Sequence, residues 1–298
     1  MNEIFNKNET VADCNVCGAN DYRLLFEEAY EDKAVFCVRR CNRCGLIATL
    51  PQPDSEFIEE LYRDESYRNK SVSGTYCLDA EASSLDFSWA LASLDAGPQS
   101  KRLLDIGCGA GHFVGFALSR DWDAYGAEPS SYAGAIAAED YPGRIFNGYV
   151  KDSAFEPASF DVVTVWYVLE HVPDPAALIR TAKHYLKPGG RLLIAVPNAH
   201  YILFRRWLGK VLKRAPGSVH AHEHLYQFSP QTLKRLVSSI HFDRVRLAVA
   251  SPYYVSRPIL NFAKWISHKL VRLLFSLTGV HLGGLILIAH NREAPNQP

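Results

Sequence analysis

The stretch from Leu103 to Phe113, LLDIGCGAGHF, constrains the fold of this chain more than any other segment. A short apolar strand that contains Asp105 is followed by glycines at 107, 109 and 111, and a helix is predicted to begin directly after them. Glycines permit a tight turn and a close approach of a ligand to the backbone. The first turn of a helix adds unpaired N–H groups and the positive end of its dipole. The stretch therefore predicts a site for a nucleotide-type cofactor, with a Gly-x-Gly-x-Gly spacing that differs from the Gly-x-Gly-x-x-Gly of dinucleotide binders.

From residue 102 onward, strand-like and helix-like segments alternate, which predicts an α/β fold with a Rossmann-like sheet and helices on both faces. The seven predicted strands cover residues 103–106, 124–127, 144–146, 161–168, 191–196, 244–250 and 285–289. Helices are expected at 112–119, 130–139, 174–186 and 230–240. Ser130 is a plausible helix cap, and Ser229-Pro230 is a strong helix start, because Ser caps well and Pro suits the first helical position. The turn Lys187-Pro188-Gly189-Gly190 is expected to separate the third of these helices from the next strand.

Three acidic residues come at or after the ends of the first three predicted strands. These are Asp105, Glu128 and Asp152. Ligands of such sheets bind at the carboxyl ends of the strands, near the point where strand order reverses. Glu128 follows the glycine turn by about 20 residues, the separation expected of an acid that binds ribose hydroxyls. We expect Asp105 to order the glycine loop or contact the ligand, and Asp152 to lie near its base.

Four segments in sequence order, LLDIGCGAGHF, YGAEPS, FDVVTVWYVLEHVPDP and LKPGGRLLIAVPN, resemble the successive motifs of class I S-adenosylmethionine-dependent methyltransferases. The resemblance is dense over residues 101–198 and loose elsewhere. It implies a seven-stranded methyltransferase sheet and S-adenosylmethionine as the cofactor. The cofactor-binding residues it implies are Asp105, Gly107, Gly109, Gly111, His112, Phe113, Glu128, Pro129, Asp152 and Trp166.

Four of the seven cysteines form two Cys-x-x-Cys pairs, Cys14 with Cys17 and Cys41 with Cys44. Each pair is followed by glycine, and short strands are expected between the pairs at 23–26 and 35–38. Four thiolates suit tetrahedral zinc with no open coordination position, so we predict a zinc ribbon whose metal is structural. Such pairs also indicate a reducing compartment. Residues 1–10 lack the basic and apolar regions of a secretory signal, which favours a cytoplasmic location.

The predicted organisation is a zinc-ribbon module over residues 1–50, a helical linker or cover over 51–97, and a methyltransferase domain over 98–298. Within the cover, Tyr62, Tyr67 and Tyr76 are candidates to line a substrate cleft or to serve as ordinary packing residues.

The net charge of zero conceals an asymmetry, because residues 1–100 carry 9 basic and 18 acidic side chains and the remainder carry 23 basic and 14 acidic ones. Such segregation bears on partners rather than on fold.

The segment around residues 221–229, AHEHLYQFS, suggests a narrower resemblance. Methyltransferases of bacterial sugar and polysaccharide pathways often carry an N-terminal four-Cys module, and the deoxysugar C-methyltransferases among them have a similar His-Glu-His-Leu segment preceded by Tyr. Here that Tyr is replaced by Ala221, and the extra C-terminal domain of that group is missing. The catalytic candidates, which could remove a proton from the acceptor, are His171, His222, Glu223 and His224. A cleft-capping loop and a metal site formed by histidines on one face of that segment remain alternatives.

Two basic amphipathic segments, at about 199–218 and 255–278, interrupt the core pattern. Basic helices that contain Trp can lie in an anionic membrane surface. The same apolar stripes could instead pack on the sheet or form a homodimer interface. We therefore keep open both a peripheral contact with the inner membrane face and a homodimer.

The pattern as a whole predicts a methyltransferase for a sugar, glycan or other small-molecule acceptor, with lipid-linked acceptors included. One alternative is an RNA methyltransferase that grips nucleic acid with its zinc ribbon and basic half. Residues 1–50 carry 6 basic and 8 acidic side chains, so this module lacks the basic footprint of an RNA binder. A second alternative is a non-catalytic protein that binds S-adenosylmethionine.

Overall fold

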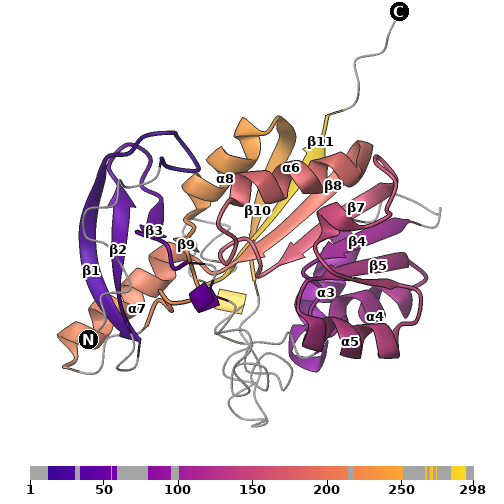
Figure 1. Cartoon of the computed structure of the whole chain (residues 1–298), viewed down its shortest axis with the longest axis horizontal. Coiled ribbons are helices and arrows are strands. Elements are labelled where there is room, and N and C mark those ends of the chain that lie inside the picture. The colour runs from indigo at the N-terminus through magenta and orange to yellow at the C-terminus, as the bar shows by residue number, and fades with distance from the viewer. Residues whose placement is uncertain are drawn as a thin grey trace, which may run out of the picture.

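The computed structural model describes residues 13–30, 34–54, 56–58, 80–94, 101–213, 218–250, 266, 269–270, 273 and 283–292. It contains two sheets that lie side by side, a small one near the N-terminus and a large one formed by the later strands (Figure 1). Tyr62, Tyr67 and Tyr76, and most of the segment 255–278, lie outside the described residues, so the predictions made for them keep that status.

The large sheet has seven strands in the order β10-β11-β8-β7-β4-β5-β6. The five strands β8, β7, β4, β5 and β6 run parallel to one another, and β11 is antiparallel to both β8 and β10. This order places β4 in the interior of the sheet and confirms the predicted seven-stranded sheet. The strands are β4 (Arg102–Ile106), β5 (Asp123–Glu128), β6 (Ile145–Asn147), β7 (Phe160–Trp166), β8 (Leu186–Val196), β10 (Phe242–Val249) and β11 (Leu285–Asn291).

The main difference from the sequence prediction lies at the start of β8. The segment from Lys187 to Gly190, expected as a turn, belongs to the strand. The register between β7 and β8 shifts there, from the pair Phe160–Leu186 to the pair Val162–Arg191. The irregular stretch absorbs the Pro and the two glycines without ending the strand, so periodicity alone places the strand start too late.

Helices cover both faces of the large sheet, because alternate residues of its strands point to opposite sides. One face buries Leu104, Val163 and Ile194 together with side chains of α6 and α8. The other buries Leu103 and Leu193 together with side chains of α3 and α4. The helices are α3 (Ala80–Leu94), α4 (His112–Leu118), α5 (Ser131–Asp140), α6 (Pro175–Tyr185), α7 (Ala199–Val211) and α8 (Pro230–Ser239), with a 3₁₀ turn η1 at Val150–Asp152.

Side-chain caps fix the starts of α5, α6 and α8 where the sequence predicts them. Ser130 accepts the N–H of Ala133, and Asp174 accepts the N–H of Ala177. Ser229 forms a reciprocal capping box with Thr232. Each cap satisfies N–H groups that the first helical turn would otherwise leave unpaired. The helix starts therefore follow from local chemistry.

The small sheet has the order β1-β2-β3-β9 and joins distant parts of the chain. Its strands are β1 (Tyr22–Tyr30), β2 (Ala34–Cys41), β3 (Ile47–Thr49) and β9 (Tyr226–Gln227). In β9, Tyr226 pairs with Ala48 and Gln227 with Ile47, antiparallel to β3. Leu46 and Leu50 of the N-terminal segment, and Leu225 and Phe228 beside β9, also share one hydrophobic core with the large sheet. The N-terminal segment is thus built onto the loop that precedes α8.

The described part of α7 turns much of its apolar surface outward. Ile202 and Leu203 pack against the small sheet, whereas Phe204, Trp207 and Val211 are each about half exposed. The predicted amphipathic helix is therefore present, and only part of its apolar stripe packs on the protein. Within the described residues, no helix combines the length and hydropathy that a membrane span requires.

Candidate active site

The glycine turn between β4 and α4 forms the first part of the candidate site. Gly107, Gly109 and Gly111 have φ angles of 74°, 54° and 81°, which L-residues with side chains rarely adopt. A Cβ on Gly107 would lie 2.4 Å from Cγ2 of Val168, in the loop after β7. A Cβ on Gly109 would meet no atom within 4 Å. The turn is therefore packed at Gly107 and open at Gly109, where a ligand can approach the backbone.

Two acidic side chains lie beside this turn, as predicted. Glu128, at the end of β5, accepts the N–H of Gly109 at 2.9 Å and that of Ser130 at 2.8 Å. Burial raises the pKa of Glu128, and these two hydrogen bonds counteract the rise. Asp105 accepts a 2.6 Å hydrogen bond from the Thr164 hydroxyl, and its burial raises the pKa to about 7. The turn thus has a carboxylate on its β5 side that can bind hydroxyl groups.

Aromatic rings fix the end of β7 beside the turn. Phe113 of α4 lies 5.1 Å from Trp166, and Phe87 of α3 lies 5.2 Å from the same ring, measured between ring centroids. Trp166 is buried, and its Nε1 has no hydrogen-bond partner in the described part of the chain. These contacts place Phe113 and Trp166 in the core beneath the site.

The other predicted cofactor residues lie at its edge. His112 is the first residue of α4 and is half-buried, whereas Pro129 and Asp152 are exposed. Asp152 ends the 3₁₀ turn η1 after β6. The structure thus gathers Asp105, Glu128 and the glycines closely, and leaves Pro129 and Asp152 on the surface.

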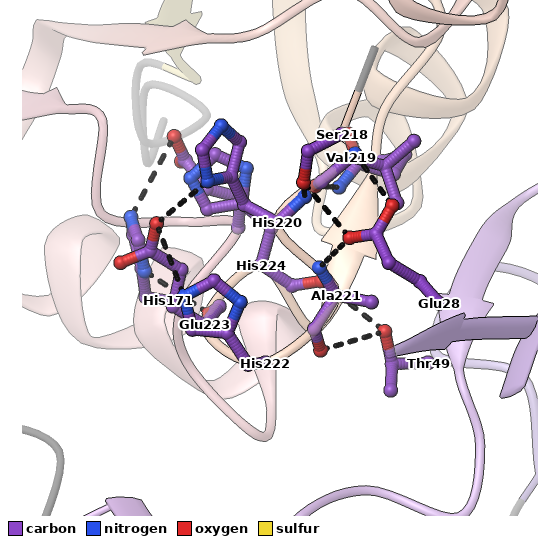
Figure 2. Close-up of polar contacts among 12 residues, drawn as sticks. Glu28, Thr49, His171, Ser218, Val219, His220, Ala221, His222, Glu223 and His224 are labelled. Atoms are coloured by element: carbon purple, nitrogen blue, oxygen red, sulfur yellow. Dashed lines mark hydrogen bonds and ion pairs between the residues drawn. The ribbon is translucent and has the colours of Figure 1, made fainter. Parts of the chain in front are cut away.

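The second part of the site joins the loop after β7 to the segment from Ser218 to Leu225, here called the histidine loop. His171 Nδ1 lies 3.1 Å from the backbone oxygen of Glu223, and the rings of His171 and His224 are 4.7 Å apart (Figure 2). The Glu223 carboxylate is buried, with Oε1 3.4 Å from His220 Nδ1 and 3.9 Å from His222 Nε2. The four predicted catalytic residues therefore come together.

Burial keeps two histidines of this cluster uncharged. Burial lowers the pKa of His171 to about 4 and also lowers that of His224. Both imidazoles are consequently neutral near pH 7, and each keeps one nitrogen lone pair. Tyr167 and His220, which flank the cluster in sequence, have φ angles of 53° and 56°. Such backbone strain in residues other than glycine tends to occur at functional sites.

The sequence analysis missed the residues that hold the histidine loop in place. Glu28, on β1, accepts the N–H groups of Val219 and Ala221 at 3.0 Å each and the Ser218 hydroxyl at 3.0 Å (Figure 2). Thr49, on β3, donates its hydroxyl to the Ala221 carbonyl at 3.2 Å. Nothing in the local sequence marks these residues, because their partners lie about 170–190 positions away.

Glu170 is a further buried acid that received no role from the sequence. It lies in the loop after β7, which ends at Trp166, and is 1% exposed. Burial raises its pKa to about 8, and the nearby charge of Glu223 adds to the rise. The available signal was an acidic residue between Leu169 and His171, shortly after a buried strand.

The four predicted zinc ligands cluster at one end of the small sheet, before β1 and at the end of β2. Cys14 Sγ lies 3.5 Å from Cys44 Sγ, and Cys17 Sγ lies 3.6 Å from Cys41 Sγ. All four sulfur atoms lie within 4.8 Å of one another. This set of thiols fits a tetrahedral zinc ion, whose Zn–S distances are about 2.3 Å.

Comparison with known proteins defines the class. Residues 86–247 match the family described as a methyltransferase domain. This match spans more than half of the chain, and the chain therefore belongs to the methyltransferase domain family. Over 139 residues it is 32% identical to the ubiquinone biosynthesis O-methyltransferase of Serratia proteamaculans, a match that covers 41% of this chain and 55% of the relative. The chain thus spans about half the length of the curated relatives it matches.

Solved structures show the same α/β methyltransferase fold. A methyltransferase of Thermotoga maritima, described as SAM-dependent and a possible histamine N-methyltransferase, aligns with a TM-score of 0.51 and 18% identity, covering 80% of this chain and 99% of that one. Phosphoethanolamine N-methyltransferase 2 of Haemonchus contortus, in complex with S-adenosyl-L-methionine, aligns with a TM-score of 0.54 and 15% identity, covering 91% and 71%. At these identities the likeness concerns the fold alone.

Proposed function

We propose that this protein is an S-adenosylmethionine-dependent methyltransferase that acts on a small-molecule acceptor. The observation that carries the proposal is the glycine turn with Glu128 hydrogen-bonded across it. Gly109 leaves its outer side open, and Glu128 can exchange its contacts with backbone N–H groups for the ribose hydroxyls of a nucleoside. The residues present therefore fit S-adenosylmethionine, with Asp105 and the three glycines beside it. When bound, this cofactor supplies an activated methyl group.

The residues of the histidine loop and His171 would supply the remaining chemistry. Methyl transfer to an oxygen or carbon atom requires the acceptor to lose a proton, and a neutral imidazole serves as the general base. His224 and His171 are neutral near pH 7, and the Glu223 carboxylate beside His220 and His222 can stabilise positive charge in the cluster. Methyl transfer also depends on alignment. The rigid attachment of the histidine loop supports its role in holding the acceptor.

We infer that the acceptor atom is an oxygen or carbon of a sugar, a glycan or another hydroxylated small molecule. The O-methyltransferase name of the curated relatives supports an oxygen acceptor of small size. The four-Cys cluster and the histidine loop support the sugar-pathway resemblance. In this proposal zinc at the four cysteines is structural, because four thiolates leave no coordination position open for a substrate. Reduced thiols also favour the cytoplasm.

We further propose that α7 contacts an anionic membrane surface, which would place the protein near a lipid-linked acceptor. Its exposed Phe204 and Trp207 lie among the exposed basic side chains of Arg205, Lys210 and Lys213. Residues 199–213 contain no acidic side chain. This combination favours anionic lipid. Flotation of the protein with vesicles of phosphatidylglycerol, but not of phosphatidylcholine, would support the contact, and loss of flotation in F204S/W207S would assign it to α7. A concentration-dependent dimer without flotation would favour a homodimer instead.

A labelling experiment tests the enzymatic proposal. The protein is incubated with S-adenosylmethionine carrying a labelled methyl group and with separate fractions of nucleotide sugars, lipid-linked glycans, quinone precursors and RNA. Label should enter one of the small-molecule or glycan fractions, and E128A should bind S-adenosylhomocysteine weakly and transfer no label. Label in RNA would show the RNA methyltransferase alternative to be right. Tight cofactor binding without label in any fraction would favour a non-catalytic binding protein.

A further inference from the structure

A group of buried donor atoms lies where the loop after β7 meets the histidine loop. Glu170, His171 and His224 each present one ligand atom to this place, and the three atoms lie within 4.8 Å of one another. Two elements contribute, because Glu170 and His171 follow β7 and His224 comes from the histidine loop, which the small sheet anchors. The four cysteines belong to a separate cluster.

Glu170 lacks the partners that a buried carboxylate needs. It is 1% exposed, and neither carboxylate oxygen accepts a hydrogen bond from another residue in the described part of the chain. Its Oε1 lies 4.0 Å from His171 Nε2. Burying a carboxylate without hydrogen bonds or a counter-charge is costly. His224 Nδ1 is likewise buried without a hydrogen-bond partner among the described residues.

A hydrogen bond to the backbone of Glu223 determines which ring nitrogen of His171 carries the proton. Nδ1 lies 3.1 Å from the carbonyl oxygen of Glu223 and can only donate to it. In the neutral imidazole, Nε2 then carries a lone pair, and this is the nitrogen that faces Glu170. Histidines that bind metals commonly donate their other N–H to a backbone carbonyl in this way, which fixes the ring and makes the ligand nitrogen more basic.

We propose that Glu170, His171 and His224 bind a divalent metal ion of the zinc type. Two imidazoles and one carboxylate are a donor set that zinc accepts, and three protein ligands leave a fourth position open. Zn–N and Zn–O distances of about 2.0–2.2 Å place neighbouring ligand atoms about 3.3 Å apart in a tetrahedron. The 4.0 Å between His171 Nε2 and Glu170 Oε1 needs only a small side-chain adjustment to reach that value.

The ion provides the counter-charge that the buried Glu170 carboxylate lacks. It also binds the Nε2 lone pair that the tautomer of His171 leaves available. With the ion bound, His171 and His224 serve as ligands, so the proton of the acceptor would pass to His222 or the Glu223 carboxylate, and the open position of the ion would hold water or an oxygen atom of the acceptor. Metal binding can be measured without an acceptor or a methyl donor, so its failure and the failure of the proposed methyl transfer are separate results.

X-ray absorption at the zinc edge tests the proposal on the unaltered protein. The full chain is dialysed against a small excess of Zn²⁺, and its metal content is measured by mass spectrometry. We expect two ions per chain, with a sulfur shell near about 2.3 Å and a nitrogen or oxygen shell near about 2.0 Å. A nitrogen/oxygen ion alone also supports the proposal. Ions with sulfur ligands alone would overturn it.

Matched variants locate the second ion. E170Q/H224Q should lose one ion per chain and the nitrogen/oxygen shell while it keeps the sulfur shell. The control E156Q/H184Q changes an exposed acid and an exposed histidine and should keep both ions. H220Q/H222Q addresses the neighbouring group formed with Glu223. If this variant loses the second ion and E170Q/H224Q retains it, the assignment to Glu170 is wrong.

Discussion

Replacing Glu28 with alanine should destabilise the protein strongly, although Glu28 lies far in sequence from the segment it supports. Its carboxylate accepts the N–H groups of Val219 and Ala221 at 3.0 Å and lies 3.6 Å from the Arg206 guanidinium. The side chains of Glu28 and Arg206 are only 12% and 13% exposed. The contact is therefore largely protected from solvent.

The magnitude follows from the groups that the substitution leaves unpaired. Each buried N–H without an acceptor costs about 1–3 kcal/mol, and the shielded guanidinium also loses its counter-charge. We expect E28A to lower the free energy of unfolding by about 3–5 kcal/mol, out of a typical total of about 5–15 kcal/mol. E28Q retains one acceptor oxygen and should lose roughly half as much.

Urea denaturation at neutral pH measures these differences, and E27A is the matched control because Glu27 is the adjacent acid on β1 and is exposed. Hydrogen exchange provides a local measurement, since the amides of Val219 and Ala221 should exchange much faster in E28A than in E27A. If E28A unfolds within about 0.5 kcal/mol of E27A, a size typical of surface changes, the anchoring role assigned to Glu28 is refuted.

Three further predictions concern the glycine turn and the metal sites. G107A should abolish binding of S-adenosylhomocysteine in calorimetry and destabilise the fold, because the new Cβ would lie 2.4 Å from Val168 Cγ2 on a backbone with φ of 74°. Normal binding by this variant would contradict the turn geometry. Burial raises the pKa of Asp105 to about 7, so the stability that this group contributes is greatest below its ordinary pKa of 3.8 and is lost as pH rises through 7. Between pH 5 and pH 8 the free energy of unfolding in urea should therefore fall by about 2–3 kcal/mol more for the wild type than for D105N. An equal fall in both proteins would exclude this. A chelator should lower the melting temperature, and it should lower that of C14S/C17S much less, because this variant lacks the four-Cys site. An equal decrease in both proteins would place the stabilising metal elsewhere.

The large sheet could be predicted well because its signals are local. The strand containing Asp105, the glycines after it and the caps Ser130, Asp174 and Ser229 each act within a few residues. Glu128 was also predictable, since its distance from the turn in sequence reflects one strand–helix–strand unit. Where a local rule misplaced an element, as at Lys187–Gly190, a change of strand register accommodated residues that usually end a strand.

The attachment of the N-terminal segment could not be predicted, because long-range pairing created it. Only two residues form β9, and no periodicity marks so short a strand. Tyr226 donates its hydroxyl to the Pro173 carbonyl at 2.9 Å and accepts hydrogen bonds from Asn15 and Gln52 at 2.7 Å each. The sequence pattern showed the cysteines and the histidines as separate motifs, whereas Tyr226, Glu28 and Thr49 join them.

This connection changes what the four-Cys module can be expected to do. A recognition module that binds an acceptor on its own would need few contacts with the catalytic loop, and it could be removed without altering the chemistry. Here β3 pairs with β9, and Glu28 and Thr49 bind the backbone of the histidine loop. The four cysteines lie in the turn before β1 and at the end of β2, and β1 carries Glu28. Loss of the zinc proposed at the cysteines should therefore impair the geometry of the histidine loop as well as the stability of the module.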